Sequence, residues 1–328
     1  MDIILINIAI SVVIFFTIAL SLIVINGKSK KIATTEDGLK FDELAIDYSN
    51  MKPLQTYICR DNTKLNYHHY QSQSETILIL LHGSGWHSQY LFRIANYISS
   101  ENISNVYTPD LRGHGKTPIR RGDIDYINQL EDDLADFIDM IKRKHPNSKI
   151  ILGGHSSGGG LAIRFAGSKY NNEIDGYILL SPFLKYNAPT MRKESGGWAF
   201  ARMPRIVGLS MLNGMRITLL NNLKVIDFNM PKDYRDGTET LSYSYRLNEG
   251  YAPRNYKKDL AKMNQKLLVV VGESDESFIA EKFSTEISSY KADAEVVLLK
   301  NTTHMGVVVG NQIGEVLSKW FTEFNESH

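Results

Sequence analysis

Residues 149–169 read KIILGGHSSGGGLAIRFAGSK, and this stretch decides the fold class of the chain. A short apolar run typical of a buried strand comes first, and a segment typical of a helix follows it. Between them lies a G-x-S-x-G motif centred on Ser156, the pattern of a nucleophile elbow. Gly154 and Gly158 suit so tight a turn, because side chains there would collide with the strand and the helix. We therefore predict a serine held at the apex of a strand–turn–helix unit.

The other parts of a serine catalytic triad follow downstream. The apolar run 266–271 ends in Gly-Glu-Ser-Asp, which places Asp275 just after a predicted strand. A second apolar run, 295–299, leads through a short polar segment to His304. Serine, acid and histidine in this chain order form one of the known arrangements of a triad.

Four stretches of the chain match motifs of a known family. They are HGSGWHSQY at 82–90, DLRGHGKT at 110–117, GHSSGG at 154–159 and LSP at 180–182. With these motifs the chain resembles the α/β-hydrolases of the monoacylglycerol lipase and lysophospholipase type. The resemblance extends over about residues 55–182 and 260–325. It implies an α/β-hydrolase fold: a mostly parallel sheet, helices on both faces and a helical cap inserted after the sixth strand.

The resemblance also assigns roles to the site residues. Ser156 would be the nucleophile, His304 the general base, and Asp275 the acid that orients the histidine. Two neighbouring glutamates are alternatives to Asp275, but the G-x-x-D spacing after the strand favours the aspartate. The backbone N–H groups of Ser84 and Ser157 would stabilise the oxyanion. Acyl transfer through a serine needs neither a metal nor an organic cofactor, so we expect none.

Three further polar residues near these motifs are predicted to be structural. We expect His82 to brace the oxyanion loop and His155 to pack away from the nucleophile. The loop that contains Arg112 is expected to be architectural. A serine at the elbow also disfavours epoxide or haloalkane chemistry, for which relatives use an aspartate there.

Strands and helices alternate along most of the chain, which is typical of βαβ units and a parallel sheet. A hairpin of residues 56–60 and 64–70 comes first. Further strands are predicted at 77–81, 105–108, 150–153, 175–180, 267–271 and 295–299. We assign residues 51–182 and 259–328 to the hydrolase core.

Residues 183–258 interrupt this alternation, and we assign them to a cap, or lid, because structureless connections of this length are uncommon. Residues 183–256 contain 11 Lys and Arg against 6 Asp and Glu, within a segment rich in Met, Leu and aromatic residues. Two interpretations stay open. The cap packs on the core and does no more, or it lines an acyl-chain pocket and turns basic residues toward an anionic membrane or headgroup.

The N-terminal residues 3–25 carry no charge. As a helix they would be roughly 34 Å long, enough to cross a hydrocarbon core of about 30 Å. We predict a single-pass anchor in the cell membrane, with a cleaved signal peptide or a buried helix as alternatives. Lys28, Lys30 and Lys31 follow the span, which favours a catalytic domain on the cytoplasmic side. Residues 26–50 are interpreted as a tether.

The composition limits the classes of function. The chain has 328 residues, of which 43% are hydrophobic and 22% charged, as in an ordinary globular protein. The formal net charge of +1 gives no global field that would favour nucleic acid. Cys59 is the single cysteine, so an internal disulfide is excluded.

These observations predict a membrane-anchored serine esterase acting on a single-acyl lipid, either a monoacylglycerol or a lysophospholipid. A small-ester carboxylesterase, a thioesterase or an acyltransferase would use the same triad. A receptor that binds a ligand without turnover is a further alternative, which predicts a damaged triad. The sequence does not indicate the oligomeric state.

Overall fold

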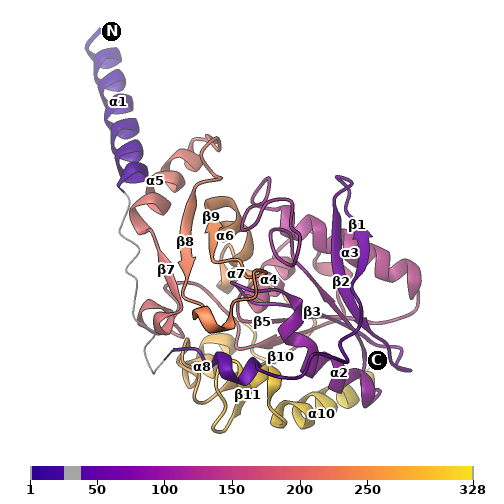
Figure 1. Cartoon of the computed structure of the whole chain (residues 1–328). Coiled ribbons are helices and arrows are strands. Elements are labelled where there is room, and N and C mark those ends of the chain that lie inside the picture. The colour runs from indigo at the N-terminus through magenta and orange to yellow at the C-terminus, as the bar shows by residue number, and fades with distance from the viewer. Residues whose placement is uncertain (1, 26–37, 327–328) are drawn as a thin grey trace.

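The computed structural model of the chain describes residues 2–25 and 38–326. An eight-stranded sheet in the order β1-β2-β4-β3-β5-β6-β10-β11 runs through its centre (Figure 1). The strands are β1 Gln55–Ile58, β2 Lys64–Tyr70, β3 Ile77–Leu81, β4 Asn105–Pro109, β5 Ile150–His155, β6 Gly176–Leu180, β10 Lys266–Gly272 and β11 Glu295–Leu299. β2 pairs antiparallel with β1 and β4, and the other neighbours are parallel. The predicted hairpin and mostly parallel sheet are confirmed.

Helices cover both faces of this sheet. On one face lie α3 Gln129–Lys144, α4 Ser157–Ala166 and α8 Lys282–Ser288, and on the other lie α2 Phe92–Ser100, α9 Gly306–Val309 and α10 Gln312–Glu326. Strand β3 shows how one apolar run fills both layers. Ile77 and Ile79 belong to the first core and Leu78 and Leu80 to the second, because successive side chains point to opposite faces.

The segment between β6 and β10 is the one predicted to be a cap, and we keep that name for it. It contains the 3-10 helices η4 Lys193–Gly197 and η5 Lys232–Tyr234, the strands β7 Ala199–Ala201, β8 Lys224–Phe228 and β9 Ser242–Ser244, and the helices α5 Met203–Gly214, α6 Tyr245–Tyr251 and α7 Tyr256–Ala261. The strands form an antiparallel sheet in the order β7-β8-β9. The cap is therefore mixed rather than helical, which departs from the sequence prediction. β7 and β9 have 3 residues each, too few for an alternating pattern to be recognised.

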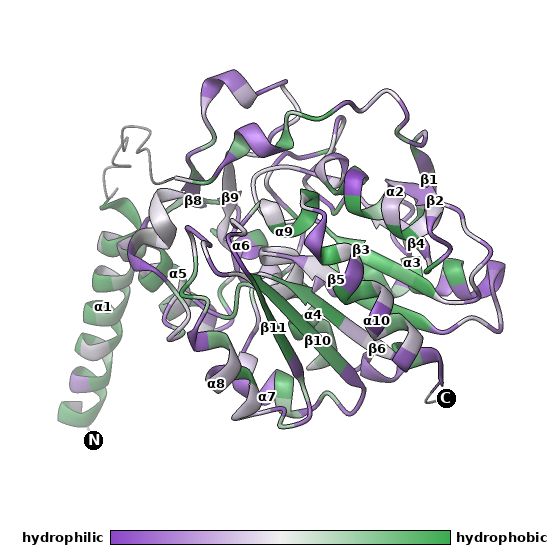
Figure 2. Cartoon of the chain, turned by 90° about the horizontal axis from the view of Figure 1, so that it is seen from below, coloured by the Kyte–Doolittle hydropathy of each residue, from purple (hydrophilic) through white to green (hydrophobic). Residues whose placement is uncertain are grey.

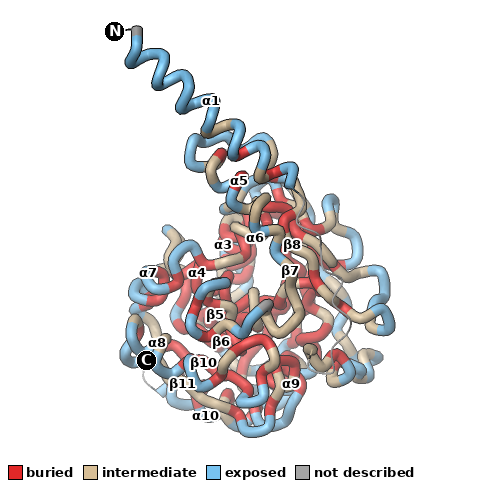
Figure 3. Tube along the Cα trace, turned by 90° about the vertical axis from the view of Figure 1, so that its left-hand side faces the viewer, coloured by how far each residue is buried: buried red, intermediate tan, exposed pale blue. Residues whose placement is uncertain are grey.

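Helix α1, Asp2–Val24, projects from the end of the molecule at which α5 lies (Figure 1). Its residues Ile3–Val24 are long and apolar enough to cross a membrane, although a signal sequence near an N-terminus meets the same criteria. Most of the helix is coloured hydrophobic in Figure 2. It is exposed along most of its length and buried only near its base, where α5 lies beside it (Figure 3).

After α1 the described residues resume at position 38, next to the core. Residues 26–37 of the predicted tether lie outside the described residues, as do the three lysines on which the predicted membrane orientation depends. The 3-10 helix η1, Phe41–Leu44, follows, and both of its terminal side chains are buried in the second core. The Phe41 ring lies 5.4 Å from the ring of Trp198 in the cap.

Candidate active site

The serine of the G-x-S-x-G motif lies on a sharp turn between β5 and α4. Ser156 has φ +54° and ψ −119°, a strained conformation for a residue with a side chain. Two glycines make room for the turn. A Cβ on Gly154 would lie 2.3 Å from the carbonyl carbon of Gly158, and one on Gly158 would lie 2.4 Å from the carbonyl oxygen of Leu81. The structure thus places Ser156 at the apex that the sequence predicted.

The acid and the histidine of the predicted triad form a buried pair. His304 Nδ1 lies 2.8 Å from Asp275 Oδ2, and the exposed fraction of each residue is at most 2%. Asp275 Oδ1 accepts hydrogen bonds from the backbone N–H groups of Ser277 and Phe278. Burial raises the pKa of Asp275, but the adjacent His304 and the hydrogen bond from the N–H of Phe278 help to lower it below its ordinary value. The charged carboxylate therefore holds Nδ1 of His304 as the donor and leaves Nε2 available as a base.

Ser156 and His304 come together at one small cavity. Both residues line a space of about 10 Å³, and Ser84 lines it as well. The structure therefore brings the predicted nucleophile, the predicted base and one predicted oxyanion donor to the same place. Glu276, an alternative acid at the sequence level, accepts a hydrogen bond from the backbone N–H of His304 and makes no contact with its Nδ1 in the described residues.

The loop that contains Ser84 is held against the elbow. A Cβ on Gly83 would lie 3.1 Å from Cβ of Ser156. The N–H groups on either side of Ser84 are occupied: Gly83 donates to the Tyr90 hydroxyl at 2.6 Å, and Gly85 donates to the Tyr243 hydroxyl at 2.9 Å. The two tyrosines therefore fix the loop and leave the N–H of Ser84 between them.

The second predicted donor belongs to the elbow helix. Ser157 is the first residue of α4, so its N–H lies at the positive end of the helix dipole. Together, the N–H groups of Ser84 and Ser157 flank the elbow from two different elements. Their role as oxyanion donors stays a prediction.

A hydrogen-bonded chain joins the Ser84 loop to the histidine, and sequence reasoning did not find it. His155 Nε2 lies 3.1 Å from the backbone oxygen of His304, and its Nδ1 lies 2.9 Å from the Tyr90 hydroxyl. A carbonyl only accepts, so Nε2 carries the proton, Nδ1 accepts from Tyr90, and Tyr90 in turn accepts from Gly83. Burial lowers the pKa of His155 to about 3, which keeps the ring neutral and this direction of donation intact.

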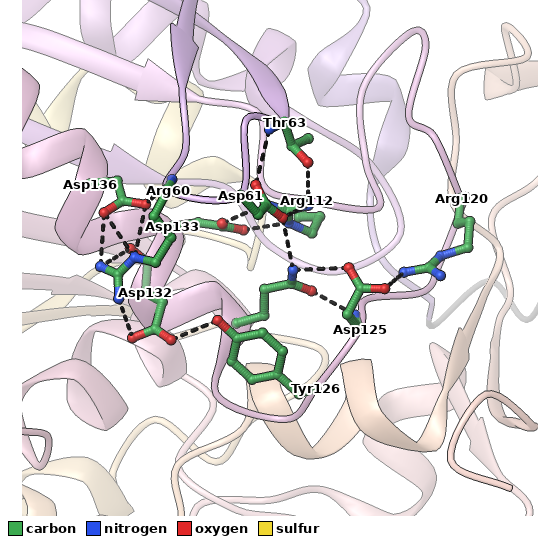
Figure 4. A network of polar contacts seen from close by, with 11 residues as sticks. Arg60, Asp61, Thr63, Arg112, Arg120, Asp125, Tyr126, Asp132, Asp133 and Asp136 are labelled. Carbon is green, nitrogen blue, oxygen red and sulfur yellow. Dashed lines mark hydrogen bonds and ion pairs between the residues drawn. The ribbon is translucent and has the colours of Figure 1, made fainter. Parts of the chain in front are cut away.

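Arg112 and His82, which were predicted to have structural roles, form hydrogen bonds with other residues of the protein. Arg112 donates two hydrogen bonds to Asp133, each of 2.7 Å, and also pairs with Asp61 (Figure 4). His82 Nδ1 lies 2.8 Å from the backbone oxygen of Gly83, and its Nε2 accepts from the N–H of Leu111. These contacts anchor the two loops beside the elbow to the core.

A larger cavity lies between the elbow and the cap. It has a volume of about 440 Å³, within the range of ligand-binding cavities. Ser84, Ser156 and Ser157 line it on the core side. The cap contributes mainly apolar side chains: Phe183, Met191, Trp198, Met203, Ile206, Val207, Met211, Ile226 and Phe228.

Trp198 connects the cap to the Ser84 loop and was not identified from the sequence. Its indole Nε1 donates to Ser84 Oγ at 3.2 Å, and its ring stacks on Phe228 at 5.3 Å. A Cβ on Gly85 would lie 2.6 Å from this ring, so only glycine admits the indole at that distance. The cap therefore rests directly on the loop that carries the predicted oxyanion donor.

Comparison with known proteins assigns the chain to a family. Residues 72–305 match the family described as "Serine aminopeptidase, S33". The chain belongs to this family.

Curated relatives are similar over parts of their length. The chain is 34% identical over 109 residues to phospholipase YtpA of Bacillus subtilis, a match that covers 33% of this chain and 40% of that protein. It is 26% identical over 106 residues to a monoacylglycerol lipase of Mycolicibacterium smegmatis, covering 32% of this chain and 37% of that protein. A monoglyceride lipase homolog of Monkeypox virus is 26% identical over 216 residues, covering 62% of this chain and 71% of that protein.

Solved structures show the fold. A soluble variant of the monoglyceride lipase of Saccharomyces cerevisiae superimposes with a TM-score of 0.62 at 19% identity, over 85% of this chain and 98% of that chain. The monoacylglycerol lipase of Paleococcus ferrophilus gives a TM-score of 0.57 at 20% identity, over 80% and 100% of the respective chains. The predicted α/β-hydrolase fold and the resemblance to monoacylglycerol lipases are confirmed.

Proposed function

We propose that the protein is a membrane-anchored serine hydrolase that cleaves carboxylic esters of single-acyl lipids, either monoacylglycerols or lysophospholipids. The observation that carries the proposal is the position of Ser156. The serine lines both the small cavity that it shares with His304 and the apolar cavity of about 440 Å³ under the cap. An activated nucleophile in the wall of a mainly apolar cavity suits an ester with one acyl chain.

The proposed reaction has two steps. Ser156 Oγ attacks the ester carbonyl carbon while His304 Nε2 takes the hydroxyl proton, and Asp275 stabilises the imidazolium that forms. The N–H groups of Ser84 and Ser157 donate to the negatively charged carbonyl oxygen, each contributing about 3 kcal/mol to the transition state. The intermediate collapses, His304 protonates the departing alcohol, and the acyl group stays on Ser156. Water activated by His304 then releases the fatty acid by the same sequence of steps.

The cavity favours an acyl substrate over the peptide that the family description names. An aminopeptidase must bind a cationic α-amino group beside the scissile bond, which requires an unopposed carboxylate. Glu249 is the one acidic residue among the described residues that line the cavity, and Lys185 lines the same cavity. The rest of the lining on the cap side is mainly apolar, and its polar residues, such as Ser195, Ser210 and Asn248, are uncharged.

The anchoring part of the proposal rests on α1. Its exposed apolar surface has no partner within the described residues beyond the base, and lipid would cover such a surface. The three lysines that follow the span favour a catalytic domain on the cytoplasmic side. Protease protection in sealed membrane vesicles tests this orientation.

Fluorophosphonate labelling of the full chain in detergent, wild type beside Ser156→Ala, tests the catalytic part of the proposal. We expect labelling of the wild type alone. A p-nitrophenyl ester series from acetate to palmitate should show activity that rises with chain length, and leucine p-nitroanilide should not be cleaved.

Other outcomes would select other functions. Activity confined to acetate and butyrate would indicate a small-ester carboxylesterase. Faster turnover of acyl thioesters, or acyl transfer to an added alcohol, would indicate a thioesterase or an acyltransferase. A folded wild type that is not labelled would contradict the proposed nucleophile and favour a non-catalytic ligand-binding protein.

A further inference from the structure

We propose that helix α5 and the loop after it are immersed in the interface of the bilayer that α1 spans, so that the acyl chain enters the cavity directly from the membrane. The inference rests on the anchoring proposed above. It concerns a set of exposed apolar residues, here named the apolar collar. The collar consists of Met203, Val207, Met215, Ile217 and Leu219.

The length of α1 indicates how deep the cap lies in the membrane. The candidate span Ile3–Val24 would be roughly 33 Å long, slightly more than a hydrocarbon core of about 30 Å. Its last part is already in contact with the cap, since Phe16, Ala19 and Ile23 pack in one cluster with α5. The remainder, from Ile3 to Phe15, is roughly 20 Å long and therefore about 10 Å too short. The span matches the bilayer when α5 is immersed by that depth, and interfacial helices are immersed by about 5–10 Å.

Helices α1 and α5 pack closely against each other. A Cβ on Gly208 would lie 2.5 Å from the backbone oxygen of Ala19 and 2.8 Å from a side-chain carbon of Ile23. The Arg205 guanidinium donates to the backbone oxygen of Ile23 at 3.1 Å. Glycine at a helix crossing permits this approach of two backbones, as in pairs of membrane helices. Wherever α1 is placed in the bilayer, α5 is carried with it.

The residues of the apolar collar are exposed along α5 and the loop after it. The exposed fraction is 85% for Leu219, 50% for Met215 and 44% for Val207. Met215 also lines a surface hollow with Phe15 and Phe16 of α1, so the collar continues the apolar surface of the span. This continuity identifies lipid, rather than a protein partner, as what covers the collar.

The collar also borders the cavity above Ser156. Met203 and Val207 line the cavity and are nevertheless 43% and 44% exposed, which places them at its mouth. An acyl chain that leaves the bilayer at this point enters the cavity without crossing water.

The charges near the collar are compatible with immersion. Besides its bond to Ile23, the Arg205 guanidinium donates to the backbone oxygen of Lys224 at 2.8 Å. Arg216 is exposed between two collar residues, and its long side chain can reach the headgroups while its stem stays in the apolar layer. Arg202 pairs with Asp227.

Depth measurements on the full chain test the proposal without any use of activity. Single cysteines are introduced at Val207 and Leu219 in a Cys59→Ser background and carry a nitrobenzoxadiazole label in phosphatidylcholine vesicles. Lys319→Cys on α10, at the end of the domain away from α1 in Figures 1 and 3, is the control. We expect doxyl-labelled lipids to quench the labels at 207 and 219, and aqueous iodide to quench the label at 319. Iodide quenching at all three positions would overturn the proposal.

A pair of glycine variants tests whether the immersion of α5 depends on its contact with α1. Gly208→Val separates α5 from α1, whereas Gly214→Val changes the same helix at a position with nothing within 4 Å. Gly208→Val should expose the label at 219 to iodide and slow the hydrolysis of vesicle-embedded monooleoylglycerol about tenfold, because the mouth loses its high local concentration of substrate. Hydrolysis of p-nitrophenyl acetate should stay unchanged, which also shows that the variant folds. Gly214→Val should behave as the wild type.

The failure of this inference can be told apart from failure of the proposed function. Release of the wild type by alkaline carbonate would contradict the anchor, and absence of fluorophosphonate labelling would contradict the catalysis. Retained anchoring and catalysis with a label at 219 accessible to iodide would overturn this inference alone. A second copy of the chain on the collar would instead protect the label from both iodide and doxyl lipids, and it too would overturn the inference.

Discussion

The elbow and the cap line the same cavity, but they are built in different ways. Around Ser156 the neighbours are backbone atoms, and a Cβ on Gly154 would come within 2.3 Å of one of them. The cap side of the cavity consists of flexible side chains such as Met203 and Met211, which can change shape at little cost. The comparison suggests that backbone geometry fixes the chemistry, whereas replaceable side chains set substrate preference. Substitutions in the two regions should therefore have effects of different kind and size.

The largest effect is expected from Asp275→Asn. The amide cannot hold the tautomer of His304 that exposes a basic Nε2, so kcat on p-nitrophenyl butyrate should fall by about 10⁴ with little change in KM. Glu273→Gln is the matched control, because Glu273 lies in the same turn and is exposed. Equal losses in both variants would contradict the assignment of the acid.

A glycine-to-alanine substitution compares the two regions with one chemical change. In the elbow, Gly154→Ala places a methyl group against Gly158 and must displace the turn. A displacement of about 1 Å at the nucleophile costs on the order of 10²-fold in kcat. In the cap, Gly214→Ala meets open space and should leave kcat within about twofold, since it removes no contact. Similar kinetics for the two variants would contradict the proposed difference between the elbow and the cap.

A larger side chain in the cap should change selectivity and leave the chemistry intact. Met211→Trp fills part of the cavity, so activity on p-nitrophenyl palmitate should fall about tenfold, equivalent to losing about two buried methylene groups. Activity on the acetate ester should be unaffected. Met215→Trp, on the next turn of the chain and outside the residues that line this cavity, is the control. A uniform loss across the ester series would show that the cap also shapes the elbow.

The same contrast explains what the sequence could predict. Continuous apolar runs and paired glycines are local signals, so the parallel sheet, Ser156 and the order of the triad residues could be recognised from them. The partners of the Ser84 loop could not. Tyr243 and Trp198 reach it from positions more than a hundred residues away, and no local pattern encodes such a contact. The cap sheet was missed because its outer strands are short, and the docking of α1 depends on Gly208, a single glycine inside a helix.

The two regions should also differ in how acid changes the stability of the fold, although this effect is smaller. Burial lowers the pKa of His82 to about 4 and that of His155 to about 3, whereas residues 183–258 contain no histidine. A histidine with a lowered pKa stays neutral in the folded protein while the unfolded chain takes up the proton. Stability is therefore complete above pH ~6.5 and falls as the pH drops toward the folded values, by about 1.4 kcal/mol per pH unit for each such histidine.

Denaturation of the full chain in detergent between pH 7 and 4.5 measures this slope. The lowered pKa of Asp275 acts below this range, so the carboxylate contributes little to it. His155→Gln should remove one histidine's share of the slope, about 1.4 kcal/mol per pH unit, while Lys319→Gln on α10 should leave the slope as it is. A His155→Gln variant with the same slope as the wild type would mean that His155 takes up its proton without unfolding of the chain. The hydrogen bond from Tyr90 to His155 would then not survive acidification, and the chain that ties the Ser84 loop to His304 would be looser than its burial indicates.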